Sequence, residues 1–390
     1  QVRDGDLYIS GKIQTKDYAT QRGIRIPVYN HDYRPADDDP EWRPRWKIGR
    51  RGSAWRAVGS HFRFTGSQNS ASEDFEWVYY RHWIREGGQQ VTSRPLPDWT
   101  PELQKLAGRS AALSYDQSRQ RLVCCGTMSL ETRDRLLANT DAPTSRRAIQ
   151  QLYEASHVGP IVDNYGYNKG QDGRGQHEVR DLMLSVEVLP PENAGEFAIS
   201  MTDGSAEFLV VLDFEKRQVR LVSARTQHEL RSASLGPYKA GQPILVEVSL
   251  MDRQVLVALN GQLPFDPMRY PVRADRGPTP RVPVRFGARG GALEVRSLQL
   301  FRDVYYTQST GQRGCTVPVT LRANEYFVLG DNSPVSHDSR YWGEDLELTQ
   351  DLLLGKPLVV HLPSRKKRIQ IGSWETEIRI PEPSRIRYIH

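Results

Sequence analysis

The sequence has 390 residues and a formal net charge of +6 at pH 7, from 53 lysines and arginines against 47 aspartates and glutamates. That length allows two or more domains. The small, dispersed charge argues against nucleic-acid binding, which usually needs a basic patch with stacking aromatic side chains. The mean hydropathy is −0.61, and no apolar run approaches the roughly 20 residues that a membrane-spanning helix needs. Cys124, Cys125 and Cys315 lack metal-ligand or CxxC spacing, which favours ordinary thiols.

From the N-terminus, the first strand signal is DLYISGKI at residues 6–13. HDYRPADDDPEWRPRW follows at residues 31–46, and its proline and charge content predicts an irregular connector. Strand-like runs come next in WRAVGSHFRF, EDFEWVYYRHW and RLVCCGTM, which end at residues 64, 83 and 128. Residues 131–156 show a helical pattern that is broken near Pro143.

Short alternating runs separated by turns fill residues 176–302. LMLSVEVL and EFLVVLDF each place apolar side chains at every second position, and PILVEVSLMDRQVLVALNG does so twice, as a hairpin would. The apolar positions are Leu182, Leu184, Val186, Val188, Phe208, Val210, Leu212, Ile244, Val246, Val248, Leu250, Val255, Val257 and Leu259. This spacing predicts a mainly β chain with a large antiparallel β-sandwich.

YFVLGDNSPVSHDSRYWG, at residues 326–343, concentrates small polar and charged side chains after an apolar run that we expect to be a strand. Its spacing G-D-N-x-x-x-S-x-D-S-R-x-x-G resembles the last conserved box of bacterial type I signal peptidases. The matching residues are Gly330, Asp331, Asn332, Ser336, Asp338, Ser339, Arg340 and Gly343. VRDGDLYISGK, at residues 2–12, resembles the segment that follows the family's lysine box. One departure is Ser333, where the family commonly has arginine.

The resemblance implies a membrane-anchored serine endopeptidase that removes signal peptides with a serine nucleophile and a lysine general base. In such an enzyme Ser336 would orient the lysine amine, and Asp338 and Arg340 would form a buried ion pair that fixes the loop. Gly330 would leave space for the lysine chain, and Asp331 and Asn332 would satisfy backbone groups of the tight turn. Ser339 belongs to the same supporting box, and His337 falls at a variable position that we expect to be exposed.

The nucleophile and the base are not found in the family's sequence contexts. The only Ser-Met pair is Ser200-Met201, which lacks the following proline and lies in a predicted strand. Lys12 and Lys16 lie outside any lysine box, and we expect both to be exposed. The chain begins at Gln1 and not at methionine, so we expect the Ser/Lys dyad and a membrane anchor upstream of it. These 390 residues alone should then have no peptidase activity.

The predicted domains are a signal-peptidase-like first segment at 1–47, an inserted β-sandwich region at 48–302, clearest at 176–302, and a signal-peptidase-like second segment at 303–390. The middle resembles a concanavalin-A-like jelly roll, which splits the signal-peptidase-like β-fold. Because the two outer segments belong to one domain in this interpretation, residues near Ile9 should pair with the strand leading into Gly330.

The expected partners are signal peptides of secretory preproteins and, through the upstream anchor, the extracytoplasmic face of the bacterial cytoplasmic membrane. The alternative is a non-catalytic, peptidase-derived scaffold whose sandwich binds a carbohydrate or protein ligand. Trp77, Tyr79, Tyr80 and Trp83 would suit a sugar, although buried alternating aromatics are the favoured interpretation. No cofactor is predicted, and His177 has no second histidine at the spacing of a metal site.

Overall fold

The computed structural model of the chain describes most of its residues, and the statements below concern these alone. They are residues 2–33, 42–50, 52–66, 74–84, 87–88, 90–163, 177–191, 194–238, 241–271, 277–307, 313, 318–330, 333, 336–343, 348–355, 359–360, 364–371, 374–381 and 387–388. None of the helices in these ranges is long and apolar enough to cross a membrane.

The chain divides into two compact units, and one is inserted into the sequence of the other. The larger unit is residues 26–303, and the smaller combines residues 1–25 with 304–390. The first boundary therefore differs from the expected residue 47. The reason is that β4 (Ile26–Asn30) pairs with β21 (Leu293–Arg302), and β5 (Trp46–Ile48) pairs with β8 (Glu76–Tyr80). The connector between β4 and β5 thus joins two strands of the larger unit.

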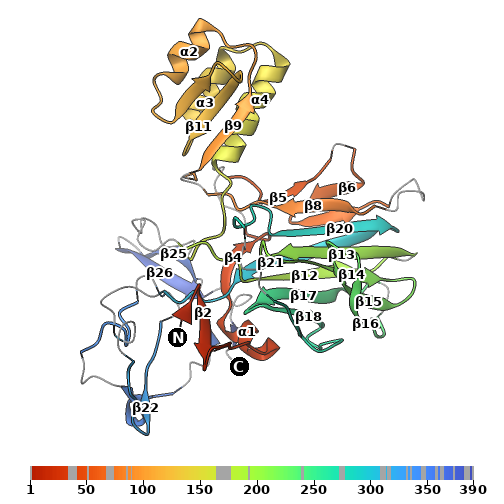
Figure 1. Cartoon of the computed structure of the whole chain (residues 1–390), viewed down its shortest axis with the longest axis vertical. Coiled ribbons are helices and arrows are strands. Elements are labelled where there is room, and N and C mark those ends of the chain that lie inside the picture. The colour runs from red at the N-terminus through yellow and green to blue at the C-terminus, as the bar shows by residue number, and fades with distance from the viewer. Residues whose placement is uncertain are drawn as a thin grey trace. The chain divides into compact units, whose positions relative to one another are not determined.

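Two antiparallel sheets dominate the larger unit, so the prediction of a mainly β chain with a large sandwich is confirmed (Figure 1). One sheet has the order β19-β18-β17-β12-β21-β7-β6, with β4 also paired to β21, and the other has the order β16-β15-β14-β13-β20-β8-β5. Their remaining strands are β6 (Trp55–Val58), β7 (His61–Phe64), β12 (Leu182–Leu189), β13 (Gly195–Thr202), β14 (Glu207–Asp213), β15 (Gln218–Ser223), β16 (Glu229–Ser234), β17 (Ile244–Met251), β18 (Gln254–Leu259), β19 (Met268–Arg269) and β20 (Val284–Gly290).

Aromatic side chains fill the space between the two sheets. Phe286 on β20 is fully buried, and its ring lies 5.3 Å from that of Trp55 and 5.5 Å from that of Phe62, both on the opposite sheet. Trp46 and Tyr80 extend this cluster from the Phe286 side. The aromatics of residues 75–83 are therefore divided between two environments. Tyr80 and Trp83 are buried, as favoured, while Trp77 and Tyr79 lie half-buried on the outer face of β8.

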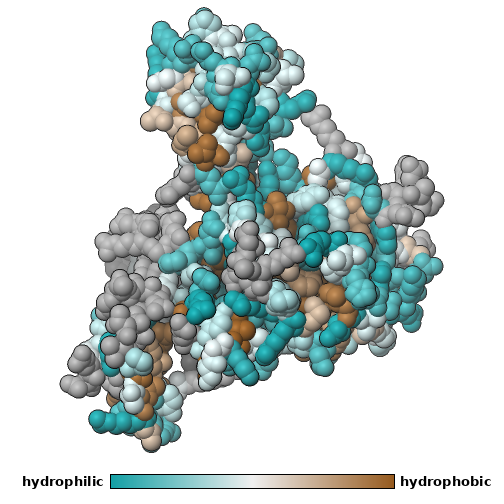
Figure 2. All heavy atoms as spheres, in the orientation of Figure 1, coloured by the Kyte–Doolittle hydropathy of each residue, from teal (hydrophilic) through white to brown (hydrophobic). Residues whose placement is uncertain are grey.

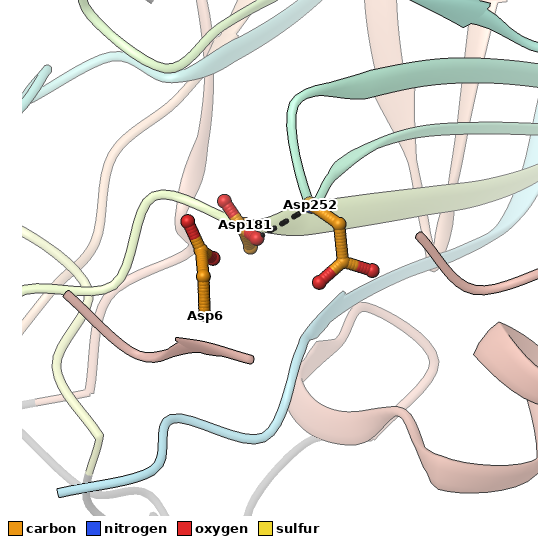
Figure 3. Close-up of side chains that lie close together, drawn as sticks. All are labelled: Asp6, Asp181 and Asp252. Atoms are coloured by element: carbon orange, nitrogen blue, oxygen red, sulfur yellow. Dashed lines mark hydrogen bonds between the residues drawn. The ribbon is translucent and has the colours of Figure 1, made fainter. Parts of the chain in front are cut away.

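The predicted hairpin of β17 and β18 closes through a two-residue turn at Asp252 and Arg253. Both residues have positive φ, 51° and 59°, as a type I′ turn requires. The turn is held by Asp181, whose Oδ2 accepts a hydrogen bond of 2.8 Å from the backbone N–H of Asp252 (Figure 3). The register pairs Val246 with Leu259, so the apolar positions of the two strands face each other as the alternation predicts.

A small α/β module interrupts the sandwich between β8 and β12. Its strands form the order β10-β11-β9, and its own buried core includes Leu103, Leu122 and Leu152. The helix that we expected to break near Pro143 is two helices, because Pro143 begins the second one at a position that needs no backbone donor. The elements are β9 (Val91–Pro95), α2 (Pro101–Ala107), β10 (Leu113–Asp116), β11 (Arg121–Cys125), α3 (Leu130–Ala138) and α4 (Pro143–Ser156).

The smaller unit consists of short elements. An N-terminal sheet has the order β1-β2-β3, and three two-stranded sheets pair β22 with β23, β24 with β27, and β25 with β26. The elements are β1 (Val2–Arg3), β2 (Asp6–Ile9), β3 (Lys12–Ile13), α1 (Tyr18–Ile24), β22 (Glu325–Tyr326), β23 (Leu348–Thr349), the 3-10 helix Gln350–Leu352, β24 (Val359–Val360), β25 (Ser364–Ile371), β26 (Trp374–Pro381) and β27 (Arg387–Tyr388).

The two sequence segments of the smaller unit meet at Gly5, which forms an antiparallel bridge with Tyr306. Gly5 has φ +87°, and a Cβ there would lie 2.5 Å from the Tyr305 ring, so only glycine fits. The expected pairing of Ile9 with the strand leading into Gly330 is wrong. Ile9 pairs with Lys12 instead, and β2 is flanked by β1 and β3, which leaves neither edge for a further strand.

We predict that Phe286→Ala lowers the free energy of unfolding of the sandwich by about 3–5 kcal/mol, because it leaves a cavity between the sheets. Urea unfolding followed by tryptophan fluorescence measures this, since Trp46 and Trp55 contact the deleted ring. Leu263→Ala is the control, because Leu263 is 40% exposed and its loss should cost no more than about 0.5 kcal/mol. An equal effect of the two substitutions would contradict the packing described here.

Candidate functional site

The box at residues 326–343 is organised by hydrogen bonds to the segment that leads into it. β22 ends at Tyr326, and the expected strand does not continue to Leu329. The reason lies at Val328, whose N–H donates to Ser339 Oγ at 2.9 Å and whose carbonyl accepts from the Ser339 N–H at 3.2 Å. Ser339 is completely buried and thereby uses both backbone groups that a neighbouring strand would need.

Asp338 and Arg340 form the ion pair that the resemblance implied. Arg340 Nε donates to Asp338 Oδ1 at 2.8 Å, and Arg340 Nη2 donates to Asp338 Oδ2 at 2.7 Å. The two side chains are 6% and 5% exposed. Two parallel hydrogen bonds of this kind fix the orientation as well as the distance of a guanidinium and a carboxylate. The pair is therefore rigid and largely removed from water.

The remaining donors of Arg340 go to Ser333 and Thr307. Arg340 Nη1 donates to Ser333 Oγ at 2.6 Å and to Thr307 Oγ1 at 2.9 Å, and Nη2 donates to the Ser333 carbonyl at 2.8 Å. Ser333 Oγ also accepts from the Thr307 N–H at 2.9 Å. Ser333 is 1% exposed, so the departure from the family pattern is a buried hydroxyl that accepts from the arginine of the box.

The charge state of Asp338 follows from these contacts. Burial alone would raise the pKa of Asp338, but hydrogen bonds from Arg340 and from the backbone N–H groups of Gly330 and Arg340 outweigh it and lower the pKa. Because the pKa is lowered in the folded state, the ionised pair contributes stability above the ordinary pKa of aspartate. That contribution is lost as the pH falls through the lowered value.

Gly330 and Ser336 lie in direct contact. The Gly330 N–H donates to Asp338 Oδ2 at 2.8 Å, which ties the glycine to the ion pair. A Cβ at residue 330 would lie 2.1 Å from Ser336 Oγ, so any larger residue would displace the hydroxyl. Ser336 is half-buried, and its hydroxyl has no hydrogen-bond partner in the described part of the chain. Its neighbour His337 is exposed, as expected.

The other predicted residues are placed as follows. Asp331 and Asn332 lie outside the described residues. Ser200 lies on β13 with 2% of its surface exposed, and its hydroxyl donates to Glu207 at 2.6 Å, so it is a sheet residue and not a nucleophile. Lys12 is exposed, whereas Lys16 is half-buried. Thr307 was not foreseen, because it lies 33 positions before Arg340 and belongs to no motif.

We predict that Asp338→Asn destabilises the box by about 3–5 kcal/mol, because it leaves the buried Arg340 without its carboxylate. Hydrogen exchange of the Gly330 and Val328 amides, measured by NMR, reports this locally. The control is Glu325→Gln, since Glu325 accepts from the Arg322 N–H at an exposed position and should change exchange little. Unchanged protection of Gly330 in Asp338→Asn would contradict the role of the pair.

We predict a second effect at Ser333. Ser333→Ala should cost about 1–3 kcal/mol, because Arg340 and Thr307 each lose a buried partner. Ser333→Arg should cost more, since a second guanidinium would enter the buried space that Arg340 already fills. The same exchange measurement ranks the two variants, and equal or smaller damage from arginine would show that Ser333 does not set the position of Arg340.

The box at residues 326–343 lies within a segment that matches a known protein family. The family model described as "Signal peptidase, peptidase S26" matches residues 291–361. The match begins at residue 291, just before β21 of the sandwich, and continues through the box. Among curated proteins, a signal peptidase I of Buchnera aphidicola subsp. Baizongia pistaciae (strain Bp) is 35% identical over 78 residues, which is 20% of this chain and 22% of that protein. The match thus spans about a fifth of the relative's length.

Solved structures give weaker similarities, each over about a third of the chain. The carbohydrate binding module CBM66 from Bacillus subtilis is 10% identical, with a TM-score of 0.24, and the similarity covers 31% of this chain and 74% of that one. The galectin LEC-6 of Caenorhabditis elegans is 15% identical, with a TM-score of 0.23, covering 30% and 81%. Within the 390 residues, the segment from 291 to 361 is similar to the signal peptidase family, peptidase S26.

Proposed function

We propose that the chain is the extracytoplasmic part of a signal peptidase I-like serine endopeptidase that removes signal peptides from secreted proteins. The single observation that supports this most is the buried Asp338–Arg340 pair, which holds Gly330, the residue that Ser336 contacts. The family match over residues 291–361 includes all of these positions. We place the nucleophile and the general base in sequence N-terminal to Gln1, because none of the serines and lysines here stands in the family's contexts.

The proposed chemistry explains why the box is built from hydroxyls and a closed ion pair. A lysine acts as a general base near neutral pH only when burial lowers its pKa. Its amine must then be held toward the serine nucleophile by a neutral partner, because a nearby anion would raise the lysine pKa again and a nearby cation would lower it further. Ser336 suits that role, since its hydroxyl is half-buried and unpaired within the described residues. Arg340 does not interfere, because Asp338 neutralises it.

The proposal gives Gly330 a role that differs from the one implied by the family resemblance. The family resemblance gave it the role of leaving space for the lysine chain. In this chain the space next to Gly330 Cα holds Ser336 Oγ. We therefore assign Gly330 to the placement of the Ser336 hydroxyl, and the lysine amine would approach that hydroxyl from its other side.

An exposed apolar surface on the smaller unit supports a location beside a membrane. Leu352, Leu353 and Leu354 are 58%, 50% and 101% exposed, and they lie at the end of the 3-10 helix that follows β23, the partner strand of β22. Figure 2 shows hydrophobic residues gathered over the part of the unit that carries β22. Exposed apolar patches of this kind mark contact surfaces. We propose that this one faces lipid on the extracytoplasmic side, where signal peptides emerge.

The alternative function is a scaffold that has kept the fold and lost the chemistry. In that case Ser336 would have no lysine to orient, and the ion pair would serve stability alone. The two proposals differ in one measurable property, which is the cleavage of a signal peptide.

The test compares the 390-residue chain with a form extended at its N-terminus by the preceding coding sequence, using a synthetic signal-peptide substrate. We predict cleavage by the extended form alone, because a serine hydroxyl needs a base within hydrogen-bond reach. Ser336→Ala in the extended form should lower kcat by about a hundredfold if the serine holds the base. His337→Ala is the matched control and should change kcat little, since His337 is exposed.

Three outcomes would decide against the proposal in different ways. Cleavage by the 390-residue chain would show that the nucleophile lies within it. Inactivity of both forms would favour the scaffold. Equal effects of Ser336→Ala and His337→Ala would remove Ser336 from the catalytic machinery.

A further inference from the structure

The outer face of the seven-stranded sheet carries a cavity of about 630 Å³ that signal-peptide cleavage does not use. The residues that line it all belong to the larger unit, on or beside strands β5, β8, β20, β14, β15 and β16, whose places Figure 1 shows. This volume is in the range of sites that hold small molecules. We therefore consider which ligand this cavity would bind, separately from the proposed peptidase activity.

Aliphatic side chains line one part of the cavity, and aromatic side chains line another. Leu209 and Val211 on β14 and Val222 on β15 line it with aliphatic groups. Phe75, Trp77 and Tyr79 line it from β8 and the residue before it, and all three are half-buried. Trp77 lies close to the sheet because its neighbour is Gly287, where a Cβ would come within 2.8 Å of the indole ring.

Three arginines of this face are held in place before any ligand arrives. Arg220 Nη2 donates to Glu196 Oε1 at 2.8 Å, and Arg289 donates to the other oxygen of the same carboxylate. Arg285 Nη2 donates to Glu207 Oε1 at 2.8 Å, and its guanidinium lies 4.6 Å from the centre of the Trp77 ring. Such contacts fix long side chains in one geometry, which lowers the entropy lost on binding.

The same network leaves hydrogen-bonding groups unused. Arg220 Nε is buried and has no partner among the described residues. Ser200 and Arg285 both donate to Glu207 Oε1, and no described group donates to Oε2. Buried donors in proteins are normally satisfied, so this unpaired N–H is available to an acceptor on a bound molecule. A ligand here must accept from a guanidinium and donate to a carboxylate.

The charges of the cavity are balanced. Four arginines line it, Arg50, Arg220, Arg285 and Arg289, together with four acidic residues, Asp74, Glu76, Glu207 and Glu229. An anionic ligand would gain nothing from a site without excess positive charge. An extended peptide would need an open strand edge, whereas this cavity lies across paired strands.

We propose that this cavity binds a neutral saccharide. A sugar hydroxyl both accepts and donates, so adjacent hydroxyls would accept from the Arg220 and Arg285 N–H groups and donate to Glu207 Oε2. The C–H groups of the sugar ring would lie against Trp77 and the aliphatic side chains of β14. Neutrality, preorganised donors and an apolar lining are together the properties that a neutral saccharide requires.

The test screens the 390-residue chain against immobilised neutral oligosaccharides of glucose, galactose, mannose, xylose and N-acetylglucosamine, with sialylated and uronate-containing glycans on the same surface. The best neutral binder is then titrated in solution by calorimetry. Arg220→Ala should weaken binding at least about tenfold, because it removes the unpaired donor. Glu196 keeps its contact with Arg289 in this variant, so the sheet should remain folded.

Two further variants keep the test decisive. Glu207→Gln preserves the shape of the side chain and should also weaken binding about tenfold. Arg63→Ala removes a paired arginine from the other sheet, where Arg63 lies 3.3 Å from Glu294, and should leave binding unchanged. Binding to no neutral glycan, binding to the anionic glycans alone, or equal binding by Arg220→Ala, Glu207→Gln and Arg63→Ala would each overturn the proposal.

Discussion

The candidate site depends on the ion pair between Asp338 and Arg340. An isolated charge at this depth would be costly, and a single long arginine would have many conformations. The bidentate contact removes both problems, and it then organises its surroundings. Asp338 Oδ2 receives the Gly330 N–H, and Arg340 Nη1 reaches Ser333 and Thr307. The position of the Ser336 hydroxyl follows, because Gly330 is the residue against which it packs. The Asp338–Arg340 pair therefore links Thr307, Gly330 and Ser333.

The insertion of a 278-residue unit into the smaller one is tolerated for a simple physical reason. The cost of closing a loop grows only slowly with its length, and an inserted unit that folds on its own core brings its two ends together itself. Here β4 and the end of β21 are hydrogen-bonded neighbours, with Ile26 opposite Arg302. The chain thus leaves the smaller unit after Arg25 and returns at Val304 from adjacent positions on one sheet.

Alternation of apolar residues was sufficient to predict the sandwich strands, because burial on one face imposes a period of two. The hairpin of β17 and β18 and the break near Pro143 were also predicted from local patterns. The box was found through its fixed spacing, and its ion pair is present as expected. Thr307 and the partner strand of β4 were beyond prediction, because they depend on contacts between residues far apart in sequence. The apolar run before Gly330 was wrongly expected to be a strand as far as Leu329. It has strand-forming residues, but Ser339 takes the backbone groups of Val328.

The proposed function places signal-peptide processing beside the contact between Gly330 and Ser336. The most direct measurement is a titration of the isotopically labelled 390-residue chain with a synthetic signal peptide, followed by amide chemical shifts in NMR. The account predicts saturable shifts at Gly330, Ser336 and Arg340, with little change on the sandwich strands. Shifts confined to the sandwich, or none at all with a peptide that the extended form cleaves, would contradict it.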